Sequence, residues 1–437
     1  MTSHSIQFSS LCFIAVVHCM LMSCSVSYKI GKQANNAILA QQPFSMAHVG
    51  IAVYDASSNK SLYQHNAAKL FVPASNTKLF ACYAAMKYLG DSLPAAMYSI
   101  ENDKLIVQAT GDPTFLHPDF KRQPLFELMN QSRFTSIGLY TKFESNPLGK
   151  GWMWDDFNAG YMAERDPFPM YGDLATFTYK DDTLTTVPAH LAILGKPIQG
   201  QNWEVSRNLG GHYFTIKNGT GNTTPVKNAT LSMEAGSFAA GWLLDTLHKE
   251  VVPENEPLEK GKSKVLYSQP TDSLLKIMMH RSDNFFAEQT LLMVSNKKLG
   301  VMNDANIIDT LLKVDFKDLP QPPKWVDGSG LSRYNLFSPN DFVWLLKQMK
   351  QDVGMNRIKE ILPTGNTGTL TGLYANYGNR IFAKTGTLSN NVALSGYLLT
   401  KHNKTLIFSV LINNHLSQAS EIRKSIETFL SGLIEAY

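Results

Sequence analysis

The sequence predicts an α+β protein in which helices pack on an antiparallel sheet and a large β-rich insertion interrupts the chain. Strand-like runs stand near both ends of the chain and flank a middle that is rich in helical stretches. Between about residues 91 and 264 the pattern changes to short strand-like runs, turn residues and polar clusters such as KNGTGNTTPVKN. The 437 residues suffice for several domains and a sizeable core.

The composition excludes several classes of protein. Hydrophobic residues make up 44% of the chain, and 40 Lys and Arg nearly balance 36 Asp and Glu, which leaves a net charge of +4. A charge this small argues against a dedicated nucleic-acid-binding protein. Because we find neither an internal repeat nor a low-complexity tract, fibrous and solenoid classes are excluded as well.

The first segment predicts export. Residues 11–23 form an uncharged apolar run that is too short to span a bilayer but suits a secretory signal. Its end, Leu21-Met22-Ser23-Cys24, resembles a bacterial lipobox, which implies a signal peptide over 1–23 and a lipid on Cys24. We therefore expect a periplasmic lipoprotein whose only membrane attachment is this anchor. An ordinary cleaved signal and an uncleaved anchor are the alternatives.

The cysteine count bounds the chemistry of the exported part. Three of the four cysteines, Cys12, Cys19 and Cys24, lie in the first segment, which leaves Cys82 alone in the body of the chain. This count excludes a disulfide framework and a cysteine-based zinc site. Cys82 lies in an apolar run, which favours a buried, unreactive thiol.

The predicted elements follow in chain order. A hairpin over 47–66 precedes a helix over 72–90 that begins near Pro73 and ends at Gly90. Near the other end, three strands and a closing helix are predicted over 381–387, 392–400, 405–414 and 417–437. We expect one discontinuous domain, 24–90 plus 265–437, interrupted by an insertion, 91–264, that forms two small domains.

One motif could create a serine nucleophile. Ser75 and Lys78 lie three residues apart at the start of the predicted helix, so their side chains share one helix face. A serine needs an adjacent base, and a desolvated lysine can be neutral enough to accept its proton. The pattern by itself is common, since it recurs at Ser57–Lys60, Ser273–Lys276 and Ser295–Lys298. Only Ser75 follows a predicted hairpin and begins an apolar helix.

Two further motifs follow in the chain. Ser282 and Asn284 form a Ser-x-Asn pattern within MMHRSDNFFAEQ. Lys384-Thr385-Gly386-Thr387 lies on a predicted edge strand and contains the only Lys-Thr-Gly of the sequence. A glycine there lets a substrate backbone approach the strand closely, while the lysine and threonines present a cation and hydroxyls to an anion.

The ordered triple Ser-x-x-Lys, Ser-x-Asn, Lys-Thr-Gly resembles the penicillin-recognising serine acyltransferases, which include penicillin-binding proteins and class A β-lactamases. Within that group the chain is similar to the D-alanyl-D-alanine carboxypeptidase/endopeptidase family of peptidase class S13. The segments that carry this resemblance are GDPTF at 111–115, GWMWDDF at 151–157, SDNFFAE at 282–288, DGSGLSRYN at 327–335 and AKTGTL at 383–388. The resemblance implies the penicillin-binding, serine β-lactamase-like transpeptidase fold with a large insertion after the Ser-x-x-Lys helix.

The resemblance also implies roles for the motif residues. Ser75 would attack the carbonyl of the penultimate D-Ala of a peptidoglycan stem peptide, and Lys78 would accept its proton. Ser282 and Asn284 would complete the proton relay and orient the substrate amide. Lys384, Thr385 and Thr387 would hold the terminal carboxylate or polarise the relay, and the N–H groups of Ser75 and Thr387 would form the oxyanion hole.

Three more positions are implied in recognition of the stem peptide. In the family, residues equivalent to Asp156, Arg333 and Ser389 surround the side chain of diaminopimelate. The zwitterionic end of that side chain needs an anion for its ammonium and a cation for its carboxylate, so Asp156 and Arg333 make physical sense together. The neighbouring Asp155 is an alternative to Asp156.

The resulting hypothesis is a serine-type D-Ala-D-Ala carboxypeptidase, with DD-endopeptidase activity as a further option, that β-lactams inhibit. It implies no metal or organic cofactor and no nucleic-acid partner. A serine β-lactamase is the nearest enzymatic alternative, because both enzymes form the same acyl-enzyme from penicillin. A cell-wall-binding lipoprotein without activity is the alternative from another class, against which the intact motif residues argue.

Overall fold

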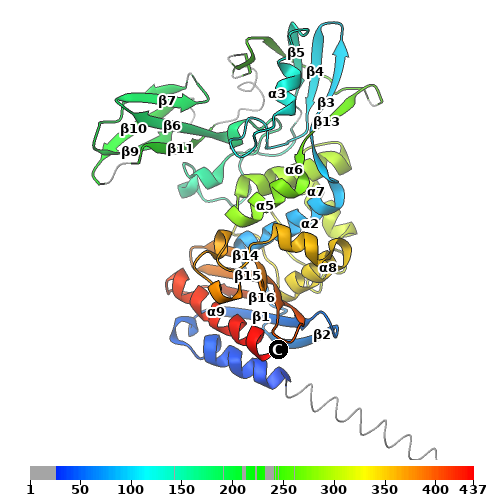
Figure 1. Ribbon diagram of the computed structural model, residues 1–437, viewed down its shortest axis with the longest axis vertical. Coiled ribbons are helices and arrows are strands. Elements are labelled where there is room, and N and C mark those ends of the chain that lie inside the picture. Colours follow the sequence, from blue (N-terminus) through cyan, green and yellow to red (C-terminus); the bar gives the residue numbers. More distant parts are fainter. Residues whose placement is uncertain are drawn as a thin grey trace, which may run out of the picture. The chain divides into compact units, whose positions relative to one another are not determined.

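The computed structural model describes residues 26–437 except 142, 190, 209–212, 222–223, 232–240, 242, 245 and 260. The predicted signal segment and Cys24 lie outside the described residues. The described chain folds as two compact units (Figure 1). Unit 1 holds residues 26–76, Leu319–Trp325 and Asn335–Tyr437, and unit 2 holds Thr77–Asp318 and Val326–Tyr334.

Unit 1 is built on a five-stranded antiparallel sheet in the order β14-β15-β16-β1-β2. Its strands are β1 (His48–Asp55), β2 (Lys60–His65), β14 (Ile381–Leu388), β15 (Asn391–Leu399) and β16 (Thr405–Asn413). Because β1 pairs with β16 along its whole length, segments from both ends of the chain form one sheet. This confirms the predicted hairpin, the three late strands and the edge position of β14.

Helices cover both faces of this sheet. Both faces of the central strands are therefore buried, which explains why apolar residues run almost uninterrupted along them. The helical elements of unit 1 are residues 26–34, η1 (Asn35–Leu39), η2 (Gln42–Phe44), α8 (Pro339–Ile361), η7 (Gly368–Leu370), η8 (Ala375–Tyr377) and α9 (Ala419–Ala436). On one face Ile422, Ile426 and Leu430 of α9 join the core around Val410. Contacts of α8 with β1, β15 and β16 cover the other face.

The helical part of unit 2 centres on α6 (Asn284–Leu299), whose residues from Phe285 to Ser295 are all buried. Its neighbours include α2 (Lys78–Tyr88), α5 (Thr271–Arg281) and α7 (Asp304–Val314). Asp283 caps the N-terminus of α6 because its side chain accepts a hydrogen bond from Phe286 N at 2.9 Å. A helix buried on all sides explains why the sequence of α6 shows no apolar stripe.

A five-stranded sheet of mixed direction, β12-β5-β4-β3-β13, begins the insertion. Its strands are β3 (Ser92–Glu101), β4 (Lys104–Ala109), β5 (Ser136–Tyr140), β12 (Glu250–Pro253) and β13 (Lys264–Pro270), and α3 (Pro124–Met129) adds to its core. Since β13 pairs antiparallel with β3, this sheet ends at Pro270, beyond the boundary at 264 expected from the sequence. The polar residues before β13 had suggested an earlier end.

Two three-stranded sheets, β8-β10-β9 and β11-β6-β7, make up the rest of the insertion. Their strands are β6 (Leu174–Lys180), β7 (Thr183–Val187), β8 (Ala192–Leu194), β9 (Asn202–Arg207), β10 (Tyr213–Gly219) and β11 (Val226–Thr230). Phe177, Trp203 and Phe214 form the centre of a core shared by these two sheets. Short 3-10 turns precede them at η4 (Trp154–Asp156), η5 (Gly160–Met162) and η6 (Tyr171–Asp173).

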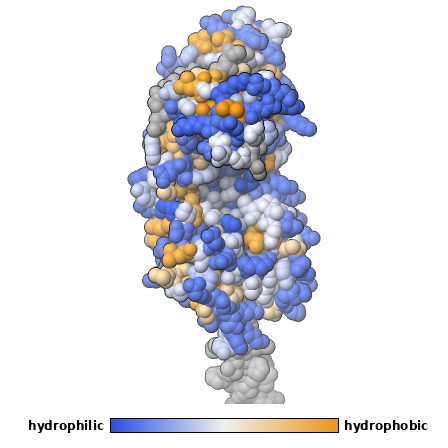
Figure 2. Space-filling model, turned by 90° about the vertical axis from the view of Figure 1, so that its left-hand side faces the viewer, coloured by the Kyte–Doolittle hydropathy of each residue, from blue (hydrophilic) through white to orange (hydrophobic). Residues whose placement is uncertain are grey.

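The surface is mostly hydrophilic on the face drawn in Figure 2, where hydrophobic side chains form small, separate groups. Exposed apolar residues include Trp154 and Tyr161 in unit 2 and Met46 and Leu416 in unit 1. Within the described residues, no helix combines the length and apolar character needed to cross a bilayer.

Candidate active site

Ser75 lies on the 3-10 turn η3 (Ala74–Thr77), which leads directly into α2. The serine is half-buried, and the residue before it, Ala74, has a φ of 48°. A left-handed backbone is unfavourable for a residue with a Cβ atom, and such strain persists only where the surrounding structure enforces it. The turn that presents Ser75 is therefore held in a set shape.

Gly386 allows β14 to lie against this turn. A Cβ atom on Gly386 would stand 2.6 Å from Pro73 O and 3.1 Å from the backbone nitrogens of Ser75 and Asn76. The glycine thus makes room for the backbone of the expected nucleophile. The expected approach of a substrate backbone to this strand stays a prediction.

The free edge of β14 carries the backbone of Thr387. Ala383 N donates to Pro363 O at 3.0 Å, outside the sheet, so the N–H of Ala383 points away from β15. The pairing of β14 with β15 is regular, and backbone direction alternates along a strand, so the N–H of Thr387 points away from β15 as well. One of the two expected oxyanion-hole donors is therefore directed out of the sheet.

Lys384 and Thr387 of this strand differ in exposure. Lys384 is fully buried, and its Nζ donates to Thr385 O at 2.7 Å. Thr387 is exposed, and its Oγ1 accepts a hydrogen bond from Arg423 Nη2 at 2.7 Å. Arg423 belongs to the first turns of α9 and had no place in the sequence-based site, because a single arginine in an amphipathic helix looks like an ordinary surface residue.

Asn76 anchors the Ser75 turn to the sheet of unit 1. Its side chain is completely buried, and Nδ2 donates to Ser395 Oγ at 2.7 Å. Ser395 Oγ in turn donates to Ser409 Oγ at 2.8 Å, which links β15 to β16. This polar chain fixes the turn from the side of the strands.

Lys78 is the first residue of α2 and is fully buried in unit 2. Its Nζ donates to Asn284 Oδ1 at 2.6 Å and to the backbone carbonyl of Ser329 at 2.7 Å. Burial lowers the pKa of Lys78 to about 8, although Asp327, Glu288 and Asp283 act in the opposite direction. A lysine with this pKa can give up its proton near neutral pH and act as a base.

The Ser-x-Asn motif spans the junction of two helices. Ser282 caps the C-terminus of α5 in a left-handed conformation with a φ of 59°, and Asn284 begins α6. While Asn284 Oδ1 accepts from Lys78, Asn284 Nδ2 donates to Tyr161 O at 2.9 Å. The structure thus brings the second motif into direct contact with the lysine of the first.

The DGSG turn supplies the second acceptor for Lys78. Asp327 holds it, since its two carboxylate oxygens accept from Gly330 N at 2.8 Å and Ser332 N at 2.7 Å. Gly328 is required here, because a Cβ atom would stand 2.7 Å from Ala287 O of α6. The turn thereby presents the carbonyl of Ser329 to the expected base.

Glu288 completes the support behind this turn, and sequence reasoning assigned it no role. Its Oε1 accepts from Ser329 N at 2.7 Å, and its Oε2 accepts from Arg165 Nη2 at 2.8 Å. Arg165 also pairs with Asp304 at 2.8 Å. Glu288, Arg165 and Ser329 are almost completely buried, whereas Asp304 is partly exposed. The only signal in the sequence that could have pointed to Glu288 is its position at the end of the SDNFFAE segment.

The residues expected to recognise diaminopimelate fall in both units. In unit 2, Arg333 Nε contacts Met153 Sδ at 3.3 Å, directly before the η4 turn that carries Asp156. The hydroxyl of Tyr161 donates to Asp156, and burial, followed by this bond, raises the pKa of Tyr161 to about 12. Ser389 lies exposed in unit 1, in the turn after β14.

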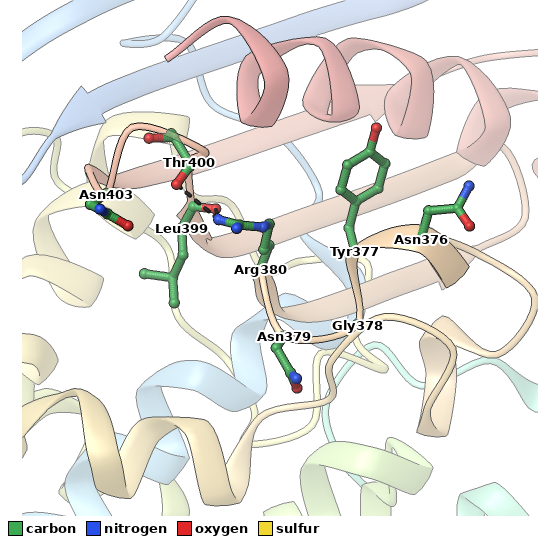
Figure 3. A pocket seen from close by; sticks show the side chains of 8 residues that line it. All are labelled: Asn376, Tyr377, Gly378, Asn379, Arg380, Leu399, Thr400 and Asn403. Carbon is green, nitrogen blue, oxygen red and sulfur yellow. Dashed lines mark hydrogen bonds between the residues drawn. The ribbon is translucent and has the colours of Figure 1, made fainter.

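A separate pocket lies at the beginning of β14 (Figure 3). It has a volume of about 560 Å³, and one of its lining residues, Arg380, donates from Nη1 to the carbonyls of Leu399 and Thr400. Asn376, Asn379 and Asn403 also line it. Among the described residues that form this pocket there is none from the three motifs.

Comparison with known sequences places this arrangement in one family. A model described as the D-Ala-D-Ala carboxypeptidase 3 (S13) family matches residues 32–187 and 207–433. A D-alanyl-D-alanine carboxypeptidase DacB of Haemophilus influenzae is 23% identical over 90% of this chain and 91% of the relative. A D-alanyl-D-alanine carboxypeptidase of an Actinomadura species is 24% identical over 88% of this chain and 81% of the relative.

Solved structures share the fold. Penicillin binding protein 4 (dacB) from Haemophilus influenzae has a TM-score of 0.74 at 18% identity, over 93% of this chain and 99% of that one. The same protein has been solved in complex with a β-lactam, with a TM-score of 0.66 at 17% identity, over 89% of this chain and 97% of that one. The predicted penicillin-binding, β-lactamase-like fold is confirmed.

Proposed function

This chain belongs to the D-Ala-D-Ala carboxypeptidase 3 (S13) family, and we propose that it hydrolyses peptidoglycan stem peptides through an acyl-enzyme on Ser75. The observation that carries this assignment is Lys78, which follows Ser75 by three residues and has a pKa lowered by burial to about 8. Hydrogen bonds to Asn284 Oδ1 and Ser329 O hold Lys78 Nζ beside the Ser-x-Asn motif. A lysine with this pKa is partly neutral near neutral pH, which is the form that a base requires.

The reaction proceeds in two steps. Ser75 Oγ attacks the carbonyl carbon of the penultimate D-Ala while Lys78 Nζ takes the hydroxyl proton. The C–N bond to the terminal D-Ala then breaks, and the amine leaves with that proton. Water attacks the resulting ester, which releases the shortened peptide and restores the serine. The N–H groups of Ser75 and Thr387 stabilise the oxyanion of each tetrahedral intermediate.

The remaining motif residues bind the peptide. Ser282 and Asn284 complete the proton relay and orient the substrate amide, while Lys384, Thr385 and Thr387 hold the terminal carboxylate. β-Lactams acylate the same serine, as supported by the β-lactam complex of the similar penicillin binding protein 4. Predatory endopeptidases of Bdellovibrio bacteriovorus share the fold, with TM-scores of 0.53 and 0.55, which makes cleavage of D-Ala cross-links a second activity to measure.

Intact mass tests the nucleophile directly. The purified protein and its Ser75→Ala variant are incubated with benzylpenicillin, and an adduct of one penicillin is expected on the wild type only. Ser273→Ala is the matched control, since it alters an exposed serine of another Ser-x-x-Lys pattern and should leave the adduct intact. An adduct on Ser75→Ala would refute the assignment. Rapid loss of penicillin without an adduct would instead indicate a β-lactamase.

The stem peptide recognised is proposed to contain diaminopimelate. Asp156 would pair with the ammonium of its side chain and Arg333 with its carboxylate. The bond from Tyr161 favours Asp156 over Asp155, because Tyr161 O also accepts from Asn284 and so connects Asp156 to the Ser-x-Asn motif. Arg333→Gln should raise KM for peptides with diaminopimelate and spare those with N-acetyl-lysine, and an equal effect on both would contradict it.

We propose that the protein is periplasmic and is attached to the membrane by a lipid on Cys24. The support is the apolar segment 11–23 followed by Leu21-Met22-Ser23-Cys24. The full chain expressed in a Gram-negative host should fractionate with membranes and release into detergent, whereas Cys24→Ala should move to the soluble periplasmic fraction. Retention of Cys24→Ala in the membrane would indicate an uncleaved anchor instead.

A further inference from the structure

Arg423 lies next to the Lys-Thr-Gly strand, and no acidic side chain in the described part of the chain pairs with it. It stands near the start of α9, half-buried, and its Nη2 donates to Thr387 Oγ1 at 2.7 Å. Its side chain also lines a small cavity together with Thr385. The guanidinium is therefore in contact with the part of β14 that presents both threonines of the motif.

The charge of Arg423 is not compensated within the described chain. No carboxylate of the described residues pairs with it, and its Nε is buried without a hydrogen-bond acceptor. The acid one turn further along α9, Glu427, is taken up by Lys424 at 2.7 Å and by the backbone N–H of Tyr374 at 2.6 Å. Burying an arginine without a counter-charge is unfavourable, so an anion from outside the chain would be stabilised there.

The bond from Arg423 also sets what Thr387 can do. Thr387 Oγ1 accepts the hydrogen bond from Arg423. The hydroxyl also has one hydrogen of its own, which it must donate to an acceptor other than Arg423. Because Thr387 is exposed on the free edge of β14, that acceptor can be a ligand. A fixed hydroxyl donor next to a guanidinium is a typical arrangement for a carboxylate.

We propose that Arg423 recognises the terminal carboxylate of the D-Ala-D-Ala substrate, by providing its counter-charge and by holding the Thr387 hydroxyl as a donor to it. The inference rests on the proposed function and adds a residue on α9, which none of the three motifs contains. Arg423 acts through Thr387 and by charge and does not touch the reacting carbonyl, so it is a positioning residue. Its removal should weaken binding of the free C-terminus and leave the chemistry at Ser75 intact.

The test compares two substrates that differ only in the terminal charge. Diacetyl-Lys-D-Ala-D-Ala and its C-terminal amide are cleaved in single-turnover reactions at high enzyme concentration, so that slow cleavage of the amide is still measured. For Arg423→Gln we expect kcat/KM for the carboxylate substrate to fall about 10- to 100-fold, mainly through KM, since a hydrogen bond to a charged group is lost. Cleavage of the amide should change less than about twofold.

Two further variants separate charge from geometry. Lys401→Gln removes an exposed cation of the same unit that pairs with Glu435 and not with Glu427, so it should leave both substrates unaffected. Arg423→Lys should restore part of the preference for the carboxylate. An equal loss on both substrates would show a merely structural role for Arg423, and an unchanged preference would refute the proposal outright. If the wild type cleaves neither substrate and takes up no penicillin, the proposed function itself fails, which is distinguishable from either result.

Discussion

At the residue scale, Lys78 is held where burial and negative charge act on it in opposite directions. Burial favours the neutral amine, whereas Asp327, Glu288 and Asp283 favour the ammonium, and burial has the larger effect. The resulting pKa of about 8 lies close to neutral pH. A base is most effective when its pKa is near the operating pH.

The pH dependence of acylation follows from this value. The lowered pKa means that the reactive neutral form of Lys78 accumulates as pH rises through about 8. The rate of acylation by benzylpenicillin should therefore rise about tenfold per pH unit below pH 8 and level off above it. Acylation is quenched at a series of times at each pH, and intact mass gives the fraction of acylated protein from which the rate is obtained. Lys78→Arg, which stays protonated, should be slower by about 10²- to 10⁴-fold, and a flat profile for the wild type would exclude Lys78 as the base.

The buried carboxylate of Glu288 allows a prediction about stability. Glu288→Ala leaves Ser329 N–H and one side of the Arg165 guanidinium without an acceptor, in a site almost closed to water. Loss of one partner of a buried ion pair should reduce the free energy of unfolding by about 3–5 kcal/mol, as measured by urea denaturation. Glu259→Ala, which breaks an exposed pair with Lys262, should cost less than about 1 kcal/mol. Equal effects would argue against this account of the network.

At the scale of elements, β14 and the η3 turn depend on each other. The strand is an edge strand, so its outer backbone groups are available, and the turn lies against it at Gly386. Asn76 and Ser395 hold the turn to the neighbouring strand by a buried hydrogen bond. The position of Ser75 relative to the N–H of Thr387 is thus decided by backbone packing.

A methyl group at Gly386 tests this dependence. Gly386→Ala would place a Cβ atom 2.6 Å from Pro73 O, so that the turn and the strand must move apart. A displacement of about 1 Å in a reacting group costs on the order of 100-fold in rate, which we expect for acylation by penicillin. At Gly378, in the same unit, a Cβ atom would stand 3.8 Å from Gly365 O. Gly378→Ala should therefore acylate normally, and normal acylation by Gly386→Ala would contradict the packing argument.

At the scale of the whole molecule, different parts of the described chain form separate cores, three of which centre on sheets. The sheet of unit 1 encloses one core together with α9, the five-stranded sheet of unit 2 forms a second, and the paired three-stranded sheets form a third. None of the expected catalytic residues belongs to the third core. We therefore expect this part of the insertion to unfold without loss of the chemistry at Ser75.

A cavity in the third core tests this independence. Phe177 is completely buried and packs edge-on against Phe214, with ring centroids 5.0 Å apart. Phe177→Ala should destabilise the two small sheets by about 3–5 kcal/mol, seen as faster amide exchange confined to β6–β11. Acylation by benzylpenicillin should stay within about twofold of the wild type. If Phe177→Ala lost acylation while β6–β11 kept their protection from exchange, the third core would not be independent of the chemistry at Ser75.

Much of the fold and part of the site could be predicted because their determinants are local. Turn residues between short apolar runs indicated β1 and β2, and Pro73 and Gly90 bounded the helix that begins at Lys78. The pairing of β13 with β3, which follows the expected boundary at 264, has no local signature in the sequence. The lipid anchor on Cys24, the diaminopimelate contacts and the catalytic roles remain predictions.

The sequence by itself determined the order of the three motifs, the family and the residue types of the reaction, because these depend on spacing along the chain. Only the tertiary structure decided which groups surround them. Lys78 reaches Ser329 across 251 residues of chain, and Arg423 reaches Thr387 across 36. An isolated glutamate, arginine or backbone carbonyl has no pattern that marks it. Its role arises when folding removes it from water and brings specific partners to it.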